Sequence, residues 1–302
     1  MFKEASTVLK TEGTDRADEL KKGVVYSPSA SRLWRPAAQR NLRNQWANLS
    51  SYKHKWASLS SSARSHATSF VNYSLSLRYM DARDLGVLTD LPGIKNKASL
   101  KLFKQQELHR SKLLASYRNM VTIVNQMVNS GASMRCFLKG VDNSSILQYS
   151  NSSLNSTDVG DGGGIPAFTF RSISSFEELA EELIHMFILE LNLKRLLVIE
   201  FISIINEDVQ KDNELCWLDE LYSGEFDDLS KCNLYSTEAC APLLPNIKGR
   251  KPGKLKLQAE HQPDEDVLQV YLTTWLADVN MDKCRVDEIF TSVAEEMNVT
   301  LV

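Results

Sequence analysis

The sequence predicts a mainly α-helical protein, in which a long helical hairpin is followed by a smaller helical domain with long irregular loops. Three observations lead to this class: two segments of helical apolar spacing, a turn between them, and a third segment that is apolar around most of its circumference. Of 302 residues, 43% are apolar and 24% charged, close to an average globular protein. This composition excludes a collagen, a mucin-like stalk and a wholly disordered chain.

The first helix is predicted from about residue 31 to 80. Six apolar residues recur there at intervals of seven: Leu42, Leu49, Trp56, Ala63, Phe70 and Leu77. This spacing gives one apolar stripe along a helix. The serines within 58–62 are poor helix formers, so a break into two helices is expected there as an alternative.

The second helix is predicted from about residue 97 to 130, after a turn at Leu91-Pro92-Gly93. Residues 30–140 thus form a basic helical hairpin. A coiled-coil-like pairing is the alternative, but Lys53 and Ser60 interrupt the heptad pattern, which favours ordinary helix packing.

The flanking segments differ from the hairpin in composition. Residues 1–29 are polar and are expected to be a disordered tail, and residues 141–164 are a Ser/Asn/Gly-rich linker. Short strands are expected at 134–138 and 165–170.

Residues 165–302 are predicted to be an acidic helical domain with an irregular region at 207–262. Its main helix is expected from Phe176 to about residue 206, and two further helices at 264–279 and 285–298. Ser-x-x-Glu capping boxes begin at Ser174 and Ser175.

The helix at 176–206 carries apolar residues on more than one face, so other helices must cover it. Either the basic hairpin packs across it or a partner subunit does. The flexible linker favours the partner subunit, with Leu193, Leu197 and Phe201 as contact residues. Trp217 and Phe226 lie in segments that alternate acidic and apolar residues, and they are further candidates for partner binding.

Charge is divided along the chain. Residues 1–140 carry 23 Lys and Arg against nine Asp and Glu, whereas residues 141–302 carry 12 against 29, within a net charge of −3. Such asymmetry indicates an anionic partner such as nucleic acid, or mutual attraction of the two halves.

A nucleic-acid-binding segment is predicted where basic residues surround Trp34 and Trp46. Its members are Arg32, Arg35, Arg40, Arg43, Lys53, Lys55 and Arg64. The alternative is that the tryptophans are core residues and the basic side chains only solvate the helix. The basic cluster at 248–254 resembles an AT-hook core or a nuclear-import signal.

The sequence offers no catalytic or metal-binding motif. Glu182 and His185 form a single E-x-x-H, the glycines at 160–164 lack a P-loop's Lys-Ser/Thr, and no G-x-S-x-G occurs. No metal or other cofactor is therefore predicted. Five cysteines without a CxxC pair fit a reducing compartment. No secretory leader and no membrane span are expected.

The functional prediction is a non-enzymatic adaptor or scaffold subunit of an intracellular, nuclear complex, with a basic half that contacts nucleic acid or chromatin. An adaptor associated with microtubules or the spindle, in the cytoplasm, is the alternative. An enzyme of unrecognised fold is the second alternative, and a pocket with converging titratable groups would favour it.

Overall fold

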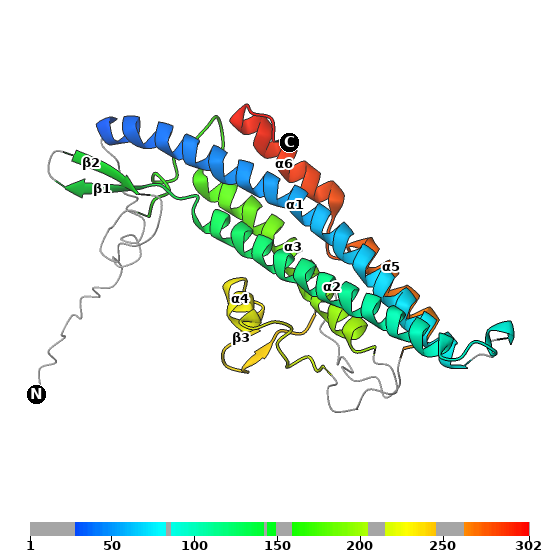
Figure 1. Ribbon diagram of the computed structural model, residues 1–302. Helices are drawn as coiled ribbons and strands as arrows, with labels where there is room; N and C mark the ends of the chain where they lie inside the picture. Colours follow the sequence, from blue (N-terminus) through cyan, green and yellow to red (C-terminus); the bar gives the residue numbers. More distant parts are fainter. Residues whose placement is uncertain are drawn as a thin grey trace, which may run out of the picture.

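The computed structural model describes residues 28–82, 86–141, 144–148, 159–204, 215–245 and 263–301. It is mainly α-helical, as the sequence predicted (Figure 1). The helices are α1 (Pro28–Ala82), a 3-10 turn (Gly86–Leu88), α2 (Ile94–Ala132), α3 (Ile173–Ile202), α4 (Glu225–Lys231), α5 (Glu265–Ala277) and α6 (Lys283–Met297). The strands are β1 (Phe137–Val141), β2 (Ser144–Gln148), β3 (Tyr235–Ser236) and β4 (Ala241–Pro242).

Helix α1 is a single helix of 55 residues, and all six residues of its seven-residue repeat are buried. The break expected at 58–62 does not occur. Trp56 and Ala63 flank the serines and are both buried, and the backbone oxygen of Ser60 accepts a hydrogen bond from Trp275 Nε1 at 3.0 Å. This packing outweighs the helix propensity of serine, which costs only about 0.5 kcal/mol per residue.

Helix α2 runs antiparallel to α1 and packs along it (Figure 1). Gly93 precedes the helix with a φ of 75°, a left-handed conformation that glycine adopts at little cost. Gly131 lies inside the last turn rather than after it. A Cβ there would lie 2.8 Å from Cδ1 of Ile184, so the glycine allows α2 to approach α3 closely.

Helix α3 lies at the centre of the helical body and contacts α1, α2, α5 and α6. It begins three residues earlier than expected, because Ser172 caps it by accepting a hydrogen bond from the backbone N–H of Ser175. Ser174 and Ser175 themselves lie in its first turn.

The expected linker at 141–164 is partly ordered. Strands β1 and β2 form an antiparallel hairpin in which Val141 pairs with Ser144. Farther along, the backbone oxygen of Gly160 accepts a hydrogen bond from the N–H of Cys136 at 3.0 Å, and Gly162 lies against the ring of Trp34. Residues 142–143 and 149–158 of this linker lie outside the described residues.

The prediction of a strand at 165–170 is wrong. The segment bends instead, because one carboxylate oxygen of Glu296 accepts the backbone N–H groups of Thr169, Phe170 and Arg171 at 2.6–3.0 Å. These donors are therefore not available to a neighbouring strand.

The region expected to be irregular, 207–262, contains α4 and the two-residue pair β3–β4. Asp264 and Asp282 cap α5 and α6 by accepting backbone N–H groups, so both helices are close to their expected bounds. The expected tail, apart from residues 28 and 29, and the basic cluster at 248–254 lie outside the described residues.

One connected apolar core holds these helices together. It joins buried residues of the hairpin, such as Trp46 and Tyr117, to buried residues of α3 and α6, such as Phe187 and Phe290. The turn between α1 and α2 extends beyond the N-terminal end of α5, at the right of Figure 1.

Candidate partner-binding surfaces

Three of the seven basic residues predicted to bind nucleic acid contact the C-terminal half of the chain. Arg35 donates hydrogen bonds to the backbone oxygens of Ala167 and Phe168, and Arg43 lies over the Phe168 ring, 5.0 Å from its centroid. Lys53 forms an ion pair with Asp287 at 3.0 Å. These side chains thus help to join the two halves of the molecule.

The other four residues differ in their surroundings. Arg40 is exposed, and Lys55 is exposed with its ammonium group 5.5 Å from the centre of the Tyr52 ring. Arg64 is half-buried at the edge of a pocket. Arg32 lies in α1, but its side chain is not described.

The tryptophans among these residues are core residues. Trp34 and Trp46 are buried, Trp34 Nε1 donates to the Cys136 oxygen at 2.9 Å, and Trp46 packs edge-on against Phe290. Their rings are therefore not exposed for stacking on bases.

The predicted partner-binding residues of α3 are largely covered by the chain itself. Leu197 and Phe201 are buried, Leu193 is partly exposed, and Phe201 packs against the rings of Tyr271 and Trp275 in α5. The arrangement matches the alternative that the hairpin packs across α3, and α5 and α6 add to this cover. A partner would reach Leu197 and Phe201 only if these helices separated.

Two adjacent cations of α3 are buried, and each fixes a different part of the C-terminal half. The Arg195 guanidinium pairs with Glu225 of α4, with Nε 2.9 Å from Oε1, and also donates to the backbone oxygens of Trp217 and Asp219. Tyr117 of α2 donates its hydroxyl to the same carboxylate at 2.7 Å. This cluster joins α2, α3, the 217–219 segment and α4 through one buried charge pair.

The environment of this cluster changes the titration of Tyr117. Its pKa is raised well above the ordinary value, first by burial and then by the neighbouring Glu225 carboxylate. Tyr117 therefore stays a hydrogen-bond donor over the whole physiological range of pH.

Lys194 fixes the corner between α5 and α6. Its ammonium group lies 2.9 Å from Glu190 and 3.0 Å from Asp278, and it also donates to the Trp275 oxygen. Glu190 in turn accepts the backbone N–H of Asn280 at 2.9 Å. The i,i+4 spacing of Glu190 and Lys194 is visible in the sequence, but the pairing of Lys194 with Asp278 and of Arg195 with Glu225, far along the chain, is not.

The predicted contact residues near α4 are also mostly internal. Trp217 is buried beneath Arg195, and its Nε1 donates to the Pro242 oxygen at 3.0 Å. Phe226 is partly exposed and stacks on Tyr235, with 5.0 Å between the ring centroids.

The distal end of the hairpin exposes apolar side chains that sequence reasoning missed. Val87 is 89% exposed, Leu91 52% and Leu100 55%. Leu88 and Phe103 are exposed as well. We call these five residues the hairpin tip. The signal available in the sequence was the density of leucine and valine around the Leu91-Pro92-Gly93 turn, where polar residues are usual.

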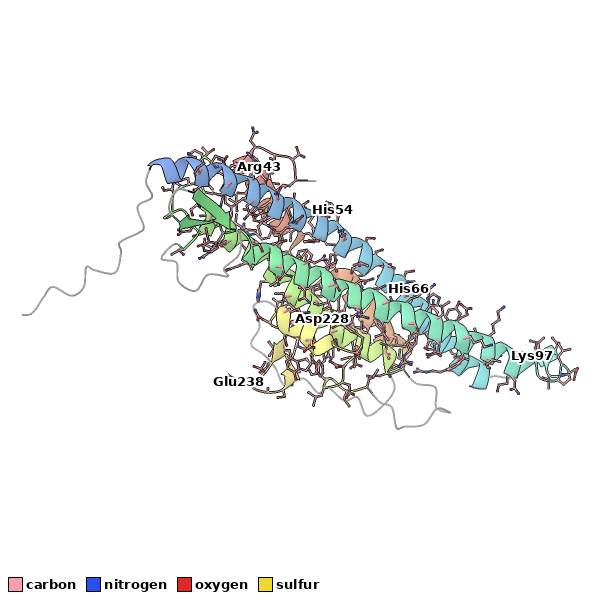
Figure 2. All side chains as sticks on the ribbon, turned by 60° about the vertical axis from the view of Figure 1, so that its left-hand side comes forward. Arg43, His54, His66, Lys97, Asp228 and Glu238 are labelled. Carbon is pink, nitrogen blue, oxygen red and sulfur yellow. The ribbon has the colours of Figure 1, made fainter. Side chains whose placement is uncertain are left out.

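A row of lysines continues from the hairpin tip along α2. Lys97, Lys101, Lys104 and Lys112 are all exposed, and their spacing places them on one face of the helix (Figure 2 labels Lys97). Leu108, also exposed, lies on the same face. We call these four lysines the lysine row.

A pair of histidines lies between α1 and α2, within the covered section of the hairpin. The rings of His66 in α1 and His109 in α2 lie 5.5 Å apart. The pKa of each is lowered, first by burial; His109 and Lys112 also lower that of His66, and Lys112 that of His109.

No protein-family model matches the chain, and the search of curated proteins found no match. Within the part of the chain that the structure describes, no helix is long and apolar enough to cross a bilayer, and no three His, Cys, Asp or Glu side chains are grouped to hold a metal ion.

Proposed function

We propose that the protein is a non-enzymatic adaptor subunit, which binds a partner protein through the hairpin tip and the lysine row. The single observation that carries this proposal is the exposure of Val87, Leu91 and Leu100 at the free end of an otherwise well-covered hairpin. Clustered apolar side chains exposed in this way are typical of interaction sites.

The apolar residues supply the affinity of such a contact. Burying a Val, Leu or Phe side chain fully is worth about 1.5–3 kcal/mol relative to leaving it in water. A partner that covers two or three tip residues therefore gains several kcal/mol before the costs of association. The rigid helices behind the tip reduce the entropy lost on binding.

The lysine row defines the charge of the partner. Lys97, Lys101 and Lys104 extend from the tip on one helix face, so a partner that covers Leu100 also approaches these ammonium groups. Complementary acidic residues would speed association and fix orientation. The partner surface is therefore apolar at its centre and acidic at its edge.

A non-enzymatic role is supported by the ion pairs of the carboxylates in the pocket between α1, α5 and α6. A pocket with converging titratable groups does exist between α1, α5 and α6, and it contains Asp278 and Asp287. Each of these carboxylates is held by a lysine, Asp278 by Lys194 and Asp287 by Lys53. Both carboxylates are thus engaged in ion pairs within the chain, so we favour an adaptor over an enzyme.

A second candidate function is contact with nucleic acid in a nuclear complex, with the lysine row as its specific support. Four exposed lysines on one helix face suit a row of phosphates. The interleaved Leu100 and Leu108 add nothing to phosphate binding, which is why a protein partner is the first candidate.

The test is quantitative affinity purification with two variants of the full chain. The tip variant carries Val87→Ser, Leu91→Ser and Leu100→Ser. The matched control carries three substitutions at exposed apolar positions elsewhere: Leu218→Ser, Val270→Ser and Val279→Ser. We expect the tip variant to recover at least tenfold less of an acidic partner protein than the wild type does. The control should recover as much of this partner as the wild type. Equal recovery by both variants would contradict the proposal.

The nucleic-acid candidate has its own measurement. Binding of a fluorescent duplex by the full chain is followed between 50 and 200 mM salt, with Lys97→Gln/Lys101→Gln/Lys104→Gln as the variant. Affinity that falls steeply with salt and is lost in the variant supports it, since phosphate contacts release counterions. Binding that is independent of salt or of these lysines would exclude it.

A further inference from the structure

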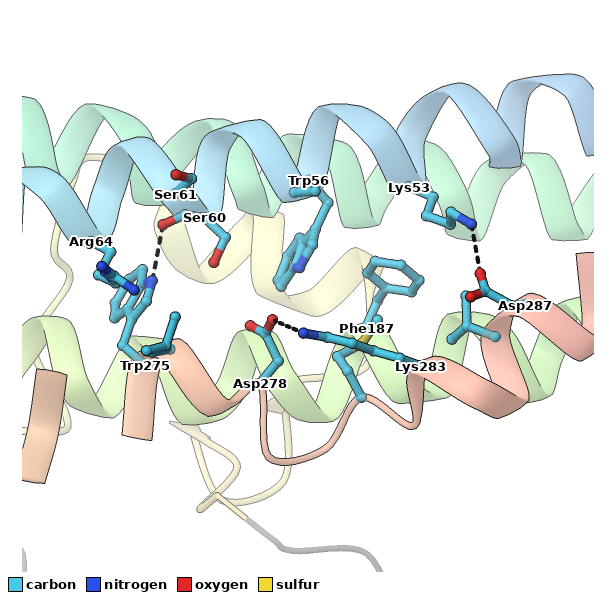
Figure 3. Close-up of a pocket in the computed structure, with 14 residues that line it drawn as sticks. Lys53, Trp56, Ser60, Ser61, Arg64, Phe187, Trp275, Asp278, Lys283 and Asp287 are labelled. Atoms are coloured by element: carbon cyan, nitrogen blue, oxygen red, sulfur yellow. Dashed lines mark hydrogen bonds and ion pairs between the residues drawn. The ribbon is translucent and has the colours of Figure 1, made fainter. Parts of the chain in front are cut away.

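The pocket between α1, α5 and α6 has a volume of about 370 Å³, and its lining combines apolar side chains with charged ones at the edge (Figure 3). This size falls within the range of small-molecule sites. Its apolar side chains come from four helices and one turn: Trp56, Phe187, Trp275, Leu276, Met281 and Val286. The site is separate from the hairpin tip.

The walls of the pocket are fixed by contacts within the chain. Trp56 and Phe187 pack edge-on with 5.4 Å between their ring centroids, and Trp275 is held by its hydrogen bond to the Ser60 oxygen. All three rings are buried, so the pocket is formed before any ligand arrives. Figure 3 shows Trp56 reaching from α1 toward the turn between α5 and α6.

The charges around the pocket leave one cation without a partner. Lys53 pairs with Asp287 at 3.0 Å, and Lys283 lies 3.7 Å from Asp278. Among the residues that the structure describes, the Arg64 guanidinium has no ion pair or hydrogen bond. The lining therefore carries three cations and two carboxylates, a balance of +1.

We propose that this pocket binds a small apolar carboxylic acid. Its carboxylate pairs with Arg64, whose planar guanidinium suits two parallel hydrogen bonds to a carboxylate. The hydrocarbon or aromatic body of the ligand lies against Ala57, Leu276 and Met281, which line the pocket in front of the three buried rings.

The same charge balance argues against larger anions. A phosphate or a nucleotide would bring two or more negative charges close to Asp278 and Asp287, with only Arg64 left to balance them. A neutral apolar molecule would contact the apolar side chains of the pocket. It would leave the Arg64 guanidinium partly desolvated and without a charged partner, which is unfavourable. An apolar monocarboxylate matches both the apolar side chains of the pocket and its balance of +1.

The test is isothermal titration calorimetry of the full chain with 4-phenylbutyrate and with its neutral amide. We expect one site per chain and a preference of at least tenfold for the acid. Arg64→Gln should remove that preference, whereas Arg40→Gln, an exposed arginine on the same helix, should keep it. Circular dichroism verifies that both variants are folded.

A second variant tests the location independently of charge. Ala57 lines the pocket and is exposed, so Ala57→Phe fills the space without disturbing buried residues. It should weaken binding of both compounds at least tenfold. The proposal is overturned if acid and amide bind equally, if Arg64→Gln keeps the preference, if Ala57→Phe binds as well as the wild type, or if no saturable binding occurs.

Discussion

The covered section of the α1–α2 hairpin and the hairpin tip are built from the same kind of sequence but have different surroundings. Over most of its length the apolar stripe is covered: Trp46, Phe70 and Tyr117 are buried. At the tip, Val87 and Leu100 are exposed although they are as apolar as the covered residues. Apolar spacing therefore shows that a surface is suited to burial, but only the tertiary arrangement shows whether this chain supplies the cover.

The basic residues divide in the same way. Arg35, Arg43 and Lys53 of α1 contact the C-terminal half, whereas Lys97 and Lys101 of α2 are exposed. The positive charge of the N-terminal half thus has two roles, internal attachment in the covered section and external charge near the tip.

The largest expected effect is at a covered tryptophan. Trp46→Ala removes a fully buried ring that packs against Phe290, and we expect the free energy of unfolding to fall by about 4 kcal/mol. Urea unfolding followed by circular dichroism measures it. A loss below about 1 kcal/mol would mean that this section of the hairpin is not core.

A smaller loss is expected where the covered section joins α4. Tyr117→Phe removes the hydroxyl donor to the buried Glu225 carboxylate but keeps the ring, at a cost of about 2 kcal/mol. The same urea titration applies, with Tyr73→Phe, a partly exposed tyrosine of α1, as the control. If both variants unfold alike, the Tyr117–Glu225 bond does not contribute to stability.

The histidine pair should make the stability of the covered section depend on pH. Because the folded pKa values of His66 and His109 lie below 6.5, the unfolded chain binds protons first. Their contribution to stability is complete above pH 6.5 and is lost as the pH falls through the lowered folded values.

The measurement compares unfolding at pH 7.5 and 5.5 for the wild type and for His66→Gln/His109→Gln. The double variant should lose less stability between these two values than the wild type does. His54→Gln, at an exposed position of α1, should behave as the wild type. If the double variant loses as much stability between these pH values as the wild type, the two histidines do not cause the pH dependence.

The smallest effect on folding is expected at the tip. Val87→Ser and Leu91→Ser should change the free energy of unfolding by no more than about 0.5 kcal/mol, because neither side chain is buried by the chain. Urea unfolding of each variant checks this. Losses near those of Trp46→Ala would show that the tip belongs to the core.

Local spacing predicted much of this fold. The six residues repeated every seven along α1 are all buried, and α5 and α6 lie within two residues of their expected bounds. Helix α4 was missed because it has only seven residues and depends on the Arg195–Glu225 pair, which bridges 30 positions. Strand β2 was missed because a Ser-rich composition conceals its pairing with β1.

The candidate sites were harder to predict than the elements. Periodicity showed that α3 needs cover, but the identity of the covering helices depends on packing between segments far apart in the chain. Likewise, Arg35 and Arg40 look equivalent in the sequence, yet only Arg35 donates to the 167–168 backbone. The tip is exposed because α5 begins beside Arg78 and Tyr79 of α1 and does not reach farther along the hairpin. No local sequence pattern shows this position.

The most direct test of the tip as the docking site is hydrogen exchange, measured by mass spectrometry, on the wild-type protein alone and in the complex recovered with it. We expect exchange to slow on complex formation in residues 86–104 and to stay unchanged in residues 42–77. Slowed exchange in 42–77, with 86–104 unchanged, would contradict the account and place the partner on the section of the hairpin that we describe as structural.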